Sequence, residues 1–600
     1  MVALMLVGSV SRGDPGVRST RPNVLLILAD DQGYGDLRRH GNDRIDTPVL
    51  DRLARQSTRF DRFMVSPLCS FTRASLLTGR YYLRTGCASV TRGLEVVRPA
   101  ELLVSERFRA AGYATGCFGK WHIGEHYPSH PRGQGFDEFL GMAQGHWDNY
   151  FNPLLQHNDS TVQTHGYITD VLTDAAIEFI RHHRDGPFFC YLPYNAPHTP
   201  MQLPDALFDK YRARGLDARA ASVYGMVENI DSNVGRLLAE LKQLGIEQNT
   251  IVLYLSDNGA EGREGSRYNA GMRGMKGSVH EGGMRVPCFI RWPKRVPSGR
   301  VIDRLTAHID ILPTLAELCH IDIPDRRRLD GRSFASLLLG RPSDWPSDRM
   351  IFHRNPGWRE LVGVAGKPLL ESVLARYPGS VRTERWRAVR ESETWQLFDM
   401  RNDPAESRDV AAQHPQVVRR LADAYDRWFD DVTKRPIVRP PIAIGYRQWP
   451  REVLNAAEAY FTGRIGWYNR FGFAHDWLTH WTDPADSIWW EVDVVEAGRF
   501  EISVRYACRQ EAVGTKLKLS VGDRAIVGTI TRPYDPHPRQ RPTRIEKRRF
   551  IQSFAEQRLG ELALRKGRCR VRLERLDRRK GPAIDIESVI VRRVDGDAAR

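Results

Sequence analysis

The sequence predicts a doubly wound α/β core with a mixed sheet, followed by a small antiparallel subdomain and then by a β-sandwich. Nearly continuous apolar runs at residues 23–29, 188–192 and 250–255 are typical of strands buried on both faces of a sheet. Helical patterns lie between these runs, and alternating strands and helices favour a doubly wound fold. From about residue 488, apolar residues recur at every second position, which indicates sandwich strands.

The chain of 600 residues is long enough for several folded units. Residues 1–20 are interpreted as a leader, because Val2 to Val10 is a short apolar run like that of a signal peptide, although a basic segment before it is missing. We expect the α/β core at 21–320, the antiparallel subdomain at 321–440 and the sandwich at 446–600. The leader favours export to the periplasm or the exterior, with a cytoplasmic location as the alternative.

Composition narrows the classes of protein and of partner. Charged residues make up 27% of the chain and hydrophobic residues 41%, which is typical of a soluble protein with a packed core. The formal charge of +16 favours anionic partners, and sulfated glycans, nucleic acid and acidic surfaces fit equally well. The eight cysteines include no CxxC pair, so they predict neither a zinc site nor a dense disulfide framework; one or two disulfides stay open.

Individual elements follow from local patterns. Apolar residues from Val223 to Leu241 recur at helical spacing, and Gly245 ends the helix. In the subdomain, residues 381–386 and 395–399 predict paired strands and residues 415–429 predict a helix. Prolines between 436 and 441 mark a linker. In the sandwich, inward faces are predicted for four sets of alternating residues: Ile488, Trp490, Val492 and Val494; Phe500, Ile502, Val504 and Tyr506; Leu517, Leu519 and Val521; and Cys569, Val571 and Leu573.

Polar side chains follow each of the three buried strands of the core. Asp30 and Asp31 come after the first strand, His198 after the second, and Asp257 and Asn258 after the third. Ligands of doubly wound sheets bind outside the carboxyl ends of the strands, so we expect these side chains to meet. Carboxylate and amide oxygens suit Ca²⁺ or Mg²⁺ and not Zn²⁺. A single Asp pair could equally cap a helix, but two pairs favour a metal site.

A cysteine lies just before a predicted helix that ends at Gly79. The N-terminus of a helix favours negative charge, so we expect it to lower the pKa of the Cys69 thiol. Arg73 lies one turn later on the same face and can reach back to residue 69.

Several ordered motifs share one resemblance. They are Leu28-Ala29-Asp30-Asp31-Gln32-Gly33-Tyr34-Gly35-Asp36-Leu37, Cys69-x-x-x-Arg73 with Leu76-Leu77-Thr78-Gly79-Arg80, Gly119-Lys120-Trp121-His122-Ile123-Gly124, Ala196-Pro197-His198, Ser256-Asp257-Asn258-Gly259, Arg273-Gly274-Met275-Lys276-Gly277 and Asn402-Asp403-Pro404-Ala405-Glu406. Together they resemble the type I, formylglycine-dependent sulfatases of the alkaline phosphatase superfamily, of the arylsulfatase kind. The resemblance covers about residues 22 to 430.

The resemblance implies a sulfuric ester hydrolase with a modified cysteine. A formylglycine-generating enzyme would convert Cys69 to an aldehyde, which hydrates to a diol. One hydroxyl would attack sulfur and displace the alcohol, and the other would collapse and expel sulfate. By the same resemblance, Asp30, Asp31, Asp257 and Asn258 would bind Ca²⁺, in preference to Mg²⁺, together with the modified Cys69.

The resemblance also assigns roles to the cationic residues. Lys120, Lys276 and His198 would hold the sulfate oxygens and the charge on the leaving oxygen. His122 would contact the diol and take a proton, and Arg73 would fix the modified residue. The expected partners are a sulfated small molecule or glycan and the maturation enzyme, with neither nucleic acid nor a membrane span.

Two positions depart from the family pattern. Phe71 stands where the modification signature has Pro or Ala, and Met275 stands where many relatives have a small residue. A bulky Phe71 could hinder conversion of Cys69, so a non-catalytic glycan-binding protein is one alternative function. A phosphodiesterase or phosphonate monoester hydrolase of the same superfamily is the other.

Substrate specificity is expected in two regions. Residues 146–150 with Arg263, Arg267 and Tyr268 are predicted to line the pocket, with ordinary loop packing as the alternative. In the sandwich, Trp467, Trp477, Trp481 and Trp489 could stack on sugars or pack against the catalytic core. Together with the basic charge, the first possibility favours a sulfated carbohydrate as substrate.

Overall fold

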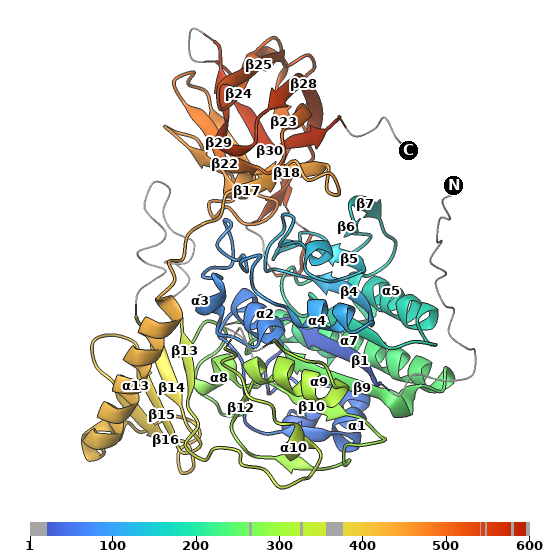
Figure 1. Cartoon of the computed structure of the whole chain (residues 1–600), viewed down its shortest axis with the longest axis vertical. Helices are drawn as coiled ribbons and strands as arrows, with labels where there is room; N and C mark the ends of the chain where they lie inside the picture. Colours follow the sequence, from blue (N-terminus) through green and yellow to red (C-terminus); the bar gives the residue numbers. More distant parts are fainter. Residues whose placement is uncertain are drawn as a thin grey trace, which may run out of the picture.

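The computed structural model describes residues 21–262, 267–324, 328–355, 376–540, 542–545, 549–577 and 581–595. The predicted leader at 1–20 lies outside these ranges. The described residues form an α/β core, a subdomain at its side and a β-sandwich at one end (Figure 1).

A ten-stranded sheet forms the centre of the core, in the order β11-β2-β10-β9-β1-β8-β4-β5-β6-β7. In that order the strands span Val301–Ile302, Thr58–Phe60, Cys288–Arg291, Thr250–Ser256, Asn23–Ala29, Phe188–Pro193, Ala114–Lys120, Glu138–Met142, Leu154–His157 and Ser160–Gln163. The strands from β9 to β5 are parallel, whereas β10 and β6 join the sheet antiparallel. The sheet is therefore mixed, as the sequence predicted.

Helices cover both faces of this sheet, which explains the unbroken apolar run of β1. Val24, Leu26 and Leu28 belong to one hydrophobic cluster, and Leu25 and Ile27 belong to another on the opposite face. The first cluster includes α2, α4 and α9 (Cys69–Thr78, Val104–Ala110 and Ile311–Cys319), and the second includes α1, α5 and α7 (Pro48–Gln56, Ile168–His182 and Ala218–Gln243). The core also contains α3, α6, α8 and α10 (Tyr82–Thr85, Asp205–Ala213, Glu281–Met284 and Ala335–Leu338).

The subdomain is a four-stranded antiparallel sheet with one long helix. Its strands are β13 to β16 (Ile351–Arg354, Gly379–Arg382, Trp386–Arg390 and Gln396–Asp399), and its helix is α13 (Pro415–Thr433). The predicted strand at 381–386 is wrong, because those residues span the end of β14, a turn and the first residue of β15. Leu421 and Tyr425 of α13 belong to the first core cluster, so the subdomain shares its interior with the core.

A buried ion cluster also fastens the subdomain to the core. Glu281 of α8 accepts a hydrogen bond from Arg382 Nε at 3.1 Å and a second from Arg387. Glu406 is 2.6 Å from His280 Nδ1 and accepts the Glu281 backbone N–H. Burial alone would raise the pKa of Glu281, but Arg382 and Arg387 outweigh burial and hold this pKa below its ordinary value.

The C-terminal part of the chain is a sandwich of two sheets around one hydrophobic cluster. One sheet has the order β17-β22-β29-β24-β25 (Ile442–Ile444, Ser487–Val494, Gly567–Arg575, Lys516–Val521 and Arg524–Thr529), with β19 (Tyr460–Phe461) beside β22. The other has the order β20-β21-β30-β23-β28 (Gly466–Trp467, Leu478–Trp481, Ile584–Arg593, Gly498–Cys508 and Ala555–Leu564), with β18 (Arg451–Asn455) beside β30. The predicted inward residues lie in the cluster or, for Cys569, pack against it.

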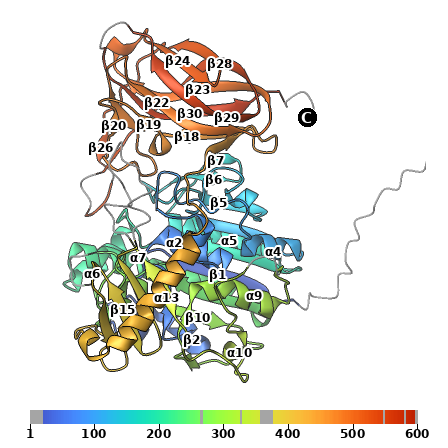
Figure 2. The ribbon, with the colours of Figure 1, turned by 60° about the vertical axis from the view of Figure 1, so that its left-hand side comes forward.

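The sandwich begins earlier than residue 446, because β17 starts at Ile442 and pairs with β22. The sandwich lies over the end of the core that carries β5, β6 and β7 (Figure 2). All eight cysteines are free, so the disulfides left open by the sequence do not form. Among the described helices, none combines the length and apolar character that a membrane crossing needs.

A single substitution in the buried ion cluster is expected to destabilise the core strongly. Glu281→Gln removes the buried carboxylate that both Arg382 and Arg387 contact, so we expect the free energy of unfolding of the core to fall by about 3–5 kcal/mol. Because the folded-state pKa of Glu281 is lowered, its contribution is present above the unfolded pKa of about 4.3 and is lost as the pH falls below it. The difference in unfolding free energy between wild type and the variant should therefore shrink as the pH falls below about 5.

Urea unfolding of wild type and of Glu281→Gln at pH 7 and pH 4 measures this difference in stability. Glu501→Gln is the matched control, because it removes the partner of Arg558, whose side chain is 53% exposed, and exposed pairs contribute about 1 kcal/mol or less. Equal losses in the two variants would contradict the prediction.

Candidate functional site

Neighbouring strands bring the predicted acidic residues together. β1 and β9 are parallel neighbours with Ala29 opposite Ser256, so Asp30 and Asp257 leave the sheet side by side. The Asp31 backbone N–H donates to Asp257 Oδ1 at 3.1 Å, and Asn258 Nδ2 donates to Asp31 Oδ1 at 2.7 Å. All four side chains are buried.

This edge offers donors for a hard cation. Ligand atoms of Asp30, Cys69 and Asp257 lie within 4.8 Å of one another, and so do those of Asp30, Asp31 and His198. Oδ1 of Asp30 and Oδ1 of Asn258 are buried and have no hydrogen-bond partner among the described residues. Since an orphaned buried oxygen is costly, both atoms fit a site that takes a cation.

Three cationic side chains balance the three carboxylates. Arg73 donates to Asp257 Oδ2 through Nε at 3.0 Å and through Nη2 at 2.8 Å. Lys120 Nζ donates to Asp30 at 2.6 Å, and Lys276 Nζ lies 2.7 Å from Asp31 Oδ1. Arg73 also donates to the Lys120 carbonyl at 2.5 Å, which ties α2 to the end of β4.

These pairs decide the charge of each carboxylate. Burial would raise the pKa of Asp30 and of Asp31, but Lys120 and Lys276 respectively outweigh burial and hold both pKa values below the ordinary range. For Asp257, burial and the carboxylate of Asp30 raise the pKa to about 7 despite Arg73.

Cys69 is the first residue of α2 and is 2% exposed. Burial raises the pKa of its thiol to about 11, although Lys120 and Lys276 act in the opposite direction. The expectation of a lowered thiol pKa at the helix N-terminus is therefore wrong, because loss of water outweighs both lysines. Arg73 lies one turn along α2, but its hydrogen bonds go to Asp257 and the Lys120 carbonyl.

A row of histidines continues the site. The ring centroid of His146 lies 5.5 Å from that of His122 and 5.3 Å from that of His198. His122 Nε2 is 2.9 Å from the Val90 carbonyl oxygen, so this nitrogen carries the proton, and the buried Nδ1 has no partner among the described residues. Burial lowers the pKa of His122 far below its ordinary value and lowers that of His198 to about 4.

Asp31 and His122 share a rare backbone conformation. Their φ angles are 68° and 64°, in the left-handed region that non-glycine residues seldom adopt. Each lies two residues after the last residue of a parallel strand, Asp31 after β1 and His122 after β4. Such strain is often found at functional sites.

One wall of the site comes from the sandwich, which sequence reasoning missed. Phe473 packs on His146 with ring centroids 4.8 Å apart, and His475 packs on Trp147 at 4.3 Å. The guanidinium of Arg549 lies 4.4 Å from the centre of the Phe473 ring. These residues are more than 300 positions from residue 146 along the chain, so no local pattern could have linked them.

The other predicted pocket residues divide between the site and the interior. Arg267 is held by Asp36 and by the Asp31 carbonyl at 2.7 Å, which makes it a support of the Asp31 turn. Tyr150 is buried and donates to the Thr199 carbonyl, whereas Tyr268 is 38% exposed. Arg263 lies outside the described residues.

The four tryptophans predicted as a possible sugar-binding surface of the sandwich lie in different environments. Trp477 and Trp481 are fully buried, so sugar stacking is wrong for these two. Both pack within the sandwich: Trp481 belongs to its hydrophobic cluster, and Trp477 stacks on Tyr468 with ring centroids 4.5 Å apart. Trp467 lies under the guanidinium of Arg92 at 4.1 Å, and Trp489 stacks on Tyr460 at 5.7 Å.

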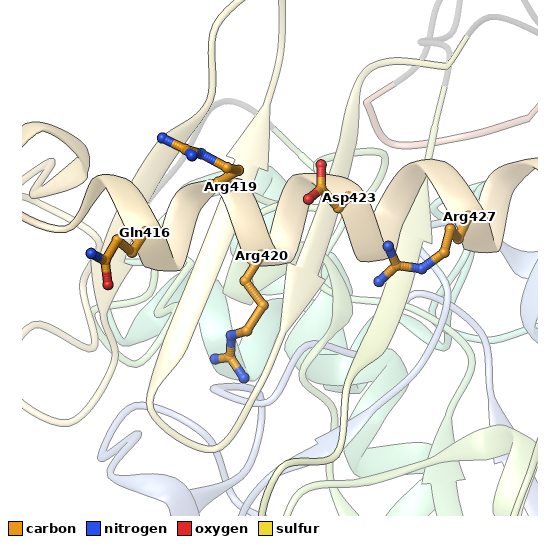
Figure 3. Close-up of a pocket in the computed structure, with 5 residues that line it drawn as sticks. All are labelled: Gln416, Arg419, Arg420, Asp423 and Arg427. Atoms are coloured by element: carbon orange, nitrogen blue, oxygen red, sulfur yellow. The ribbon is translucent and has the colours of Figure 1, made fainter.

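A separate hollow lies on α13, where Figure 3 shows its lining side chains. It is shallow and is formed by one face of the helix: Gln416, Arg419, Arg420, Asp423 and Arg427. It contains none of the residues that meet at the strand ends.

Two family models match the chain. The model described as Sulfatase matches residues 22–321, and the model described as N-sulphoglucosamine sulphohydrolase, C-terminal, matches residues 275–427.

Relatives and solved structures agree with these matches. The steryl-sulfatase of Mus musculus is 32% identical over 438 residues, which cover 57% of this chain and 69% of that protein. The N-acetylgalactosamine-6-sulfatase of Canis lupus familiaris is 32% identical over 388 residues, which cover 58% and 71%. The crystal structure of Ps i-CgsB in complex with k-i-k-neocarrahexaose has a TM-score of 0.63 and 30% identity, and the match covers 70% of this chain and 95% of that one.

The donor set at the strand ends predicts cation-dependent stability. With CaCl₂ at about 100 times its dissociation constant, we expect the folded protein to gain about 2.7 kcal/mol and its melting temperature to rise. Asp31→Asn keeps a residue that tolerates the left-handed backbone but removes a charged ligand, so the calcium-dependent rise should disappear.

Differential scanning calorimetry with and without CaCl₂ measures this. Asp43→Ala removes an exposed carboxylate of the same segment and should keep the full rise. A wild-type-sized rise in Asp31→Asn would show that calcium binds elsewhere.

Proposed function

Since the chain belongs to the sulfatase family and is a sulfuric ester hydrolase, we propose that it releases inorganic sulfate from a sulfated carbohydrate through a formylglycine made from Cys69 beside a bound Ca²⁺ ion. One observation carries this proposal. Cys69, the carboxylates of Asp30 and Asp257, and the cations that pair with them meet at the carboxyl edge of the sheet.

Asp30, Asp31, Asp257 and Asn258 would hold the cation. Their donors are all oxygens, which favours Ca²⁺ over Zn²⁺, and two of these oxygens have no other partner among the described residues. When bound, a divalent cation polarises the sulfuryl oxygens and stabilises negative charge on the nucleophile.

The cations of the chain would receive the anionic group. Lys120, Lys276 and His198 surround the carboxylate cluster, and Arg73 neutralises Asp257 from the side of α2. Three carboxylates and three permanent cations balance, so a divalent cation gives the site a net positive charge. A positive, buried site favours an anionic ester and the charge that develops on the leaving oxygen.

His122 would act as the proton acceptor. Its Nε2–H is committed to the Val90 carbonyl, so the lone pair is on Nδ1. Burial keeps the ring neutral, which leaves this lone pair free to take a proton from the nucleophile.

Conversion of Cys69 would have to precede folding. Cys69 is 2% exposed, and the adjacent Phe71 is fully buried with its ring stacked on Tyr82 at 4.0 Å. A maturation enzyme can reach the Cys69 backbone only while this segment is extended. Phe71, the departure from the modification signature, therefore has a packing role in the folded protein.

A sulfated glycan is the substrate class we propose. His146, Phe473 and Arg549 add an aromatic and basic wall beside the histidine row. Aromatic rings and cations suit the faces and sulfate groups of sugars. The similarity of this chain to Ps i-CgsB, whose structure was solved in complex with k-i-k-neocarrahexaose, supports a glycan substrate. Because such polymers are found outside cells, we propose export, with a cytoplasmic location as the alternative.

The first test compares nucleophile variants on paired aryl sulfate and aryl phosphate esters. Protein made beside a formylglycine-generating enzyme should contain a residue-69 peptide with the mass loss of thiol-to-aldehyde conversion. Cys69→Ser should lose sulfate ester turnover by several orders of magnitude, as when an enzyme nucleophile is removed.

Cys87→Ser is the matched control, because Cys87 is also buried in the same hydrophobic cluster and should keep its activity. Full activity with an unconverted Cys69 would overturn the formylglycine route. Faster turnover of the phosphate ester would favour a phosphodiesterase or phosphonate monoester hydrolase, and glycan binding without turnover would favour a non-catalytic protein.

The sandwich wall predicts a substrate-dependent effect. Phe473→Ala removes the ring that packs on His146, so kcat/KM for a sulfated oligosaccharide should fall about tenfold, which is ~1.4 kcal/mol. Turnover of a small aryl sulfate should change less than about twofold, because its ring need not reach the wall. Val527→Ala, an exposed change on β25, should affect neither substrate. Equal losses on both substrates would contradict a role in glycan recognition.

A further inference from the structure

A second cluster of potential ligands lies between the core and the sandwich. Glu125 and His126 follow β4 in the core, and Glu452 and Glu458 come from β18 and the turn after it in the sandwich. Glu452 is 7% exposed and Glu458 is 4% exposed, and the side chains of His126 and Glu125 are 12% and 16% exposed. The cluster is therefore largely, though not fully, shielded from bulk water. None of these residues contributes to the site at the strand ends.

His126 is at the centre of the cluster. Its Nε2 is 2.5 Å from Glu458 Oε2 and 3.7 Å from Glu125 Oε1, and its Nδ1 is 2.8 Å from Glu452 Oε1. One donor atom each from Glu125, His126 and Glu458 lie within 4.8 Å of one another.

The carboxylate of Glu125 is held in a fixed orientation. Its Oε2 accepts hydrogen bonds from Gln144 Nε2 at 2.5 Å and from Asn455 Nδ2 at 3.0 Å. The amides come from the core and from the sandwich, so docking of the two units sets this side chain. Both bonds go to Oε2, and Oε1 is the oxygen nearer His126.

The cluster is short of positive charge. Two buried carboxylates, Glu452 and Glu458, and the partly buried Glu125 surround one imidazole. Oε2 of Glu452 is buried without a hydrogen-bond partner in the part of the chain that the structure describes. Uncompensated buried charge is unfavourable, and a bound cation would compensate it.

The two nitrogens of His126 have the arrangement of a metal ligand. A histidine that binds metal through one nitrogen usually donates its other N–H to a carboxylate, which fixes the ring. Here Nδ1 is next to Glu452, and Nε2 is turned towards two further carboxylates. An adjacent cavity of about 70 Å³, lined in part by Gly93, Gly124, His126 and Glu458, is large enough for water ligands.

We propose that Glu125, His126 and Glu458 bind a Zn²⁺ ion that joins the sandwich to the core, with Glu452 orienting His126. One imidazole nitrogen and two carboxylate oxygens suit Zn²⁺ and distinguish this site from the all-oxygen set of the strand ends. Since the ligands come from both units, the ion stabilises their docking, and through it the position of Phe473 in the wall of the first site.

Zinc titration of the full chain tests this. EDTA-treated, dialysed protein is titrated with ZnCl₂ by isothermal titration calorimetry in millimolar CaCl₂, which occupies the oxygen site. Wild type should bind about one Zn²⁺ with a heat that His126→Gln and Glu458→Gln remove. Glu452→Gln should weaken this binding about 10–100-fold, as changes beside a metal-bound histidine do.

His157→Gln is the matched control, because His157 also lies near a glutamate, Glu138 at 3.9 Å, but its side chain is 46% exposed. It should bind zinc like wild type. X-ray absorption of wild type with one equivalent of zinc should show only nitrogen and oxygen ligands at about 2.0–2.2 Å, a result that does not depend on any variant folding. Wild type that binds no zinc, sulfur ligation, or His126→Gln with wild-type affinity would each overturn the proposal.

Discussion

The candidate site at the strand ends depends on one constraint, the pairing of three buried carboxylates with three buried cations. Asp30, Asp31 and Asp257 could not share so small a dry space unless positive charge were equally close. Arg73 supplies it from α2, Lys120 from the end of β4, and Lys276 from the loop after β9. Three segments far apart in sequence are therefore held at one sheet edge by these charges, which are also the ones that we propose recognise an anionic ester.

The backbone meets this constraint at the ends of its parallel strands. Asp31 and His122, two residues after the ends of β1 and β4, adopt left-handed conformations. Arg267 supports the first of these conformations by binding the Asp31 carbonyl and Asp36. The strain is sustained because strands buried on both faces leave the chain few other paths.

The sandwich is part of the site as well as a separate layer. Phe473 and Arg549 extend the wall around His146, and Glu452 and Glu458 meet His126 in the buried contact between the two units. A change in the docking of the sandwich would therefore move Phe473 and Arg549 relative to His146 without altering any residue at the strand ends. This gives a physical reason for keeping a buried, charged contact between two units that each have their own hydrophobic cluster.

The sequence by itself determined the mixed α/β core, the sandwich strands and the group of residues that meet at the strand ends. Periodicity and strand ends are local properties, and parallel neighbours bring their carboxyl ends to one edge, so Asp30 and Asp257 could be placed together in advance. Only the tertiary structure decided which cation pairs with which carboxylate, that burial raises the pKa of the Cys69 thiol, and that Arg267 supports a turn. It also decided that Trp477 and Trp481 are interior and that Phe473 reaches His146. These outcomes depend on burial and on contacts between distant segments, and neither is encoded in the spacing of residues along the chain.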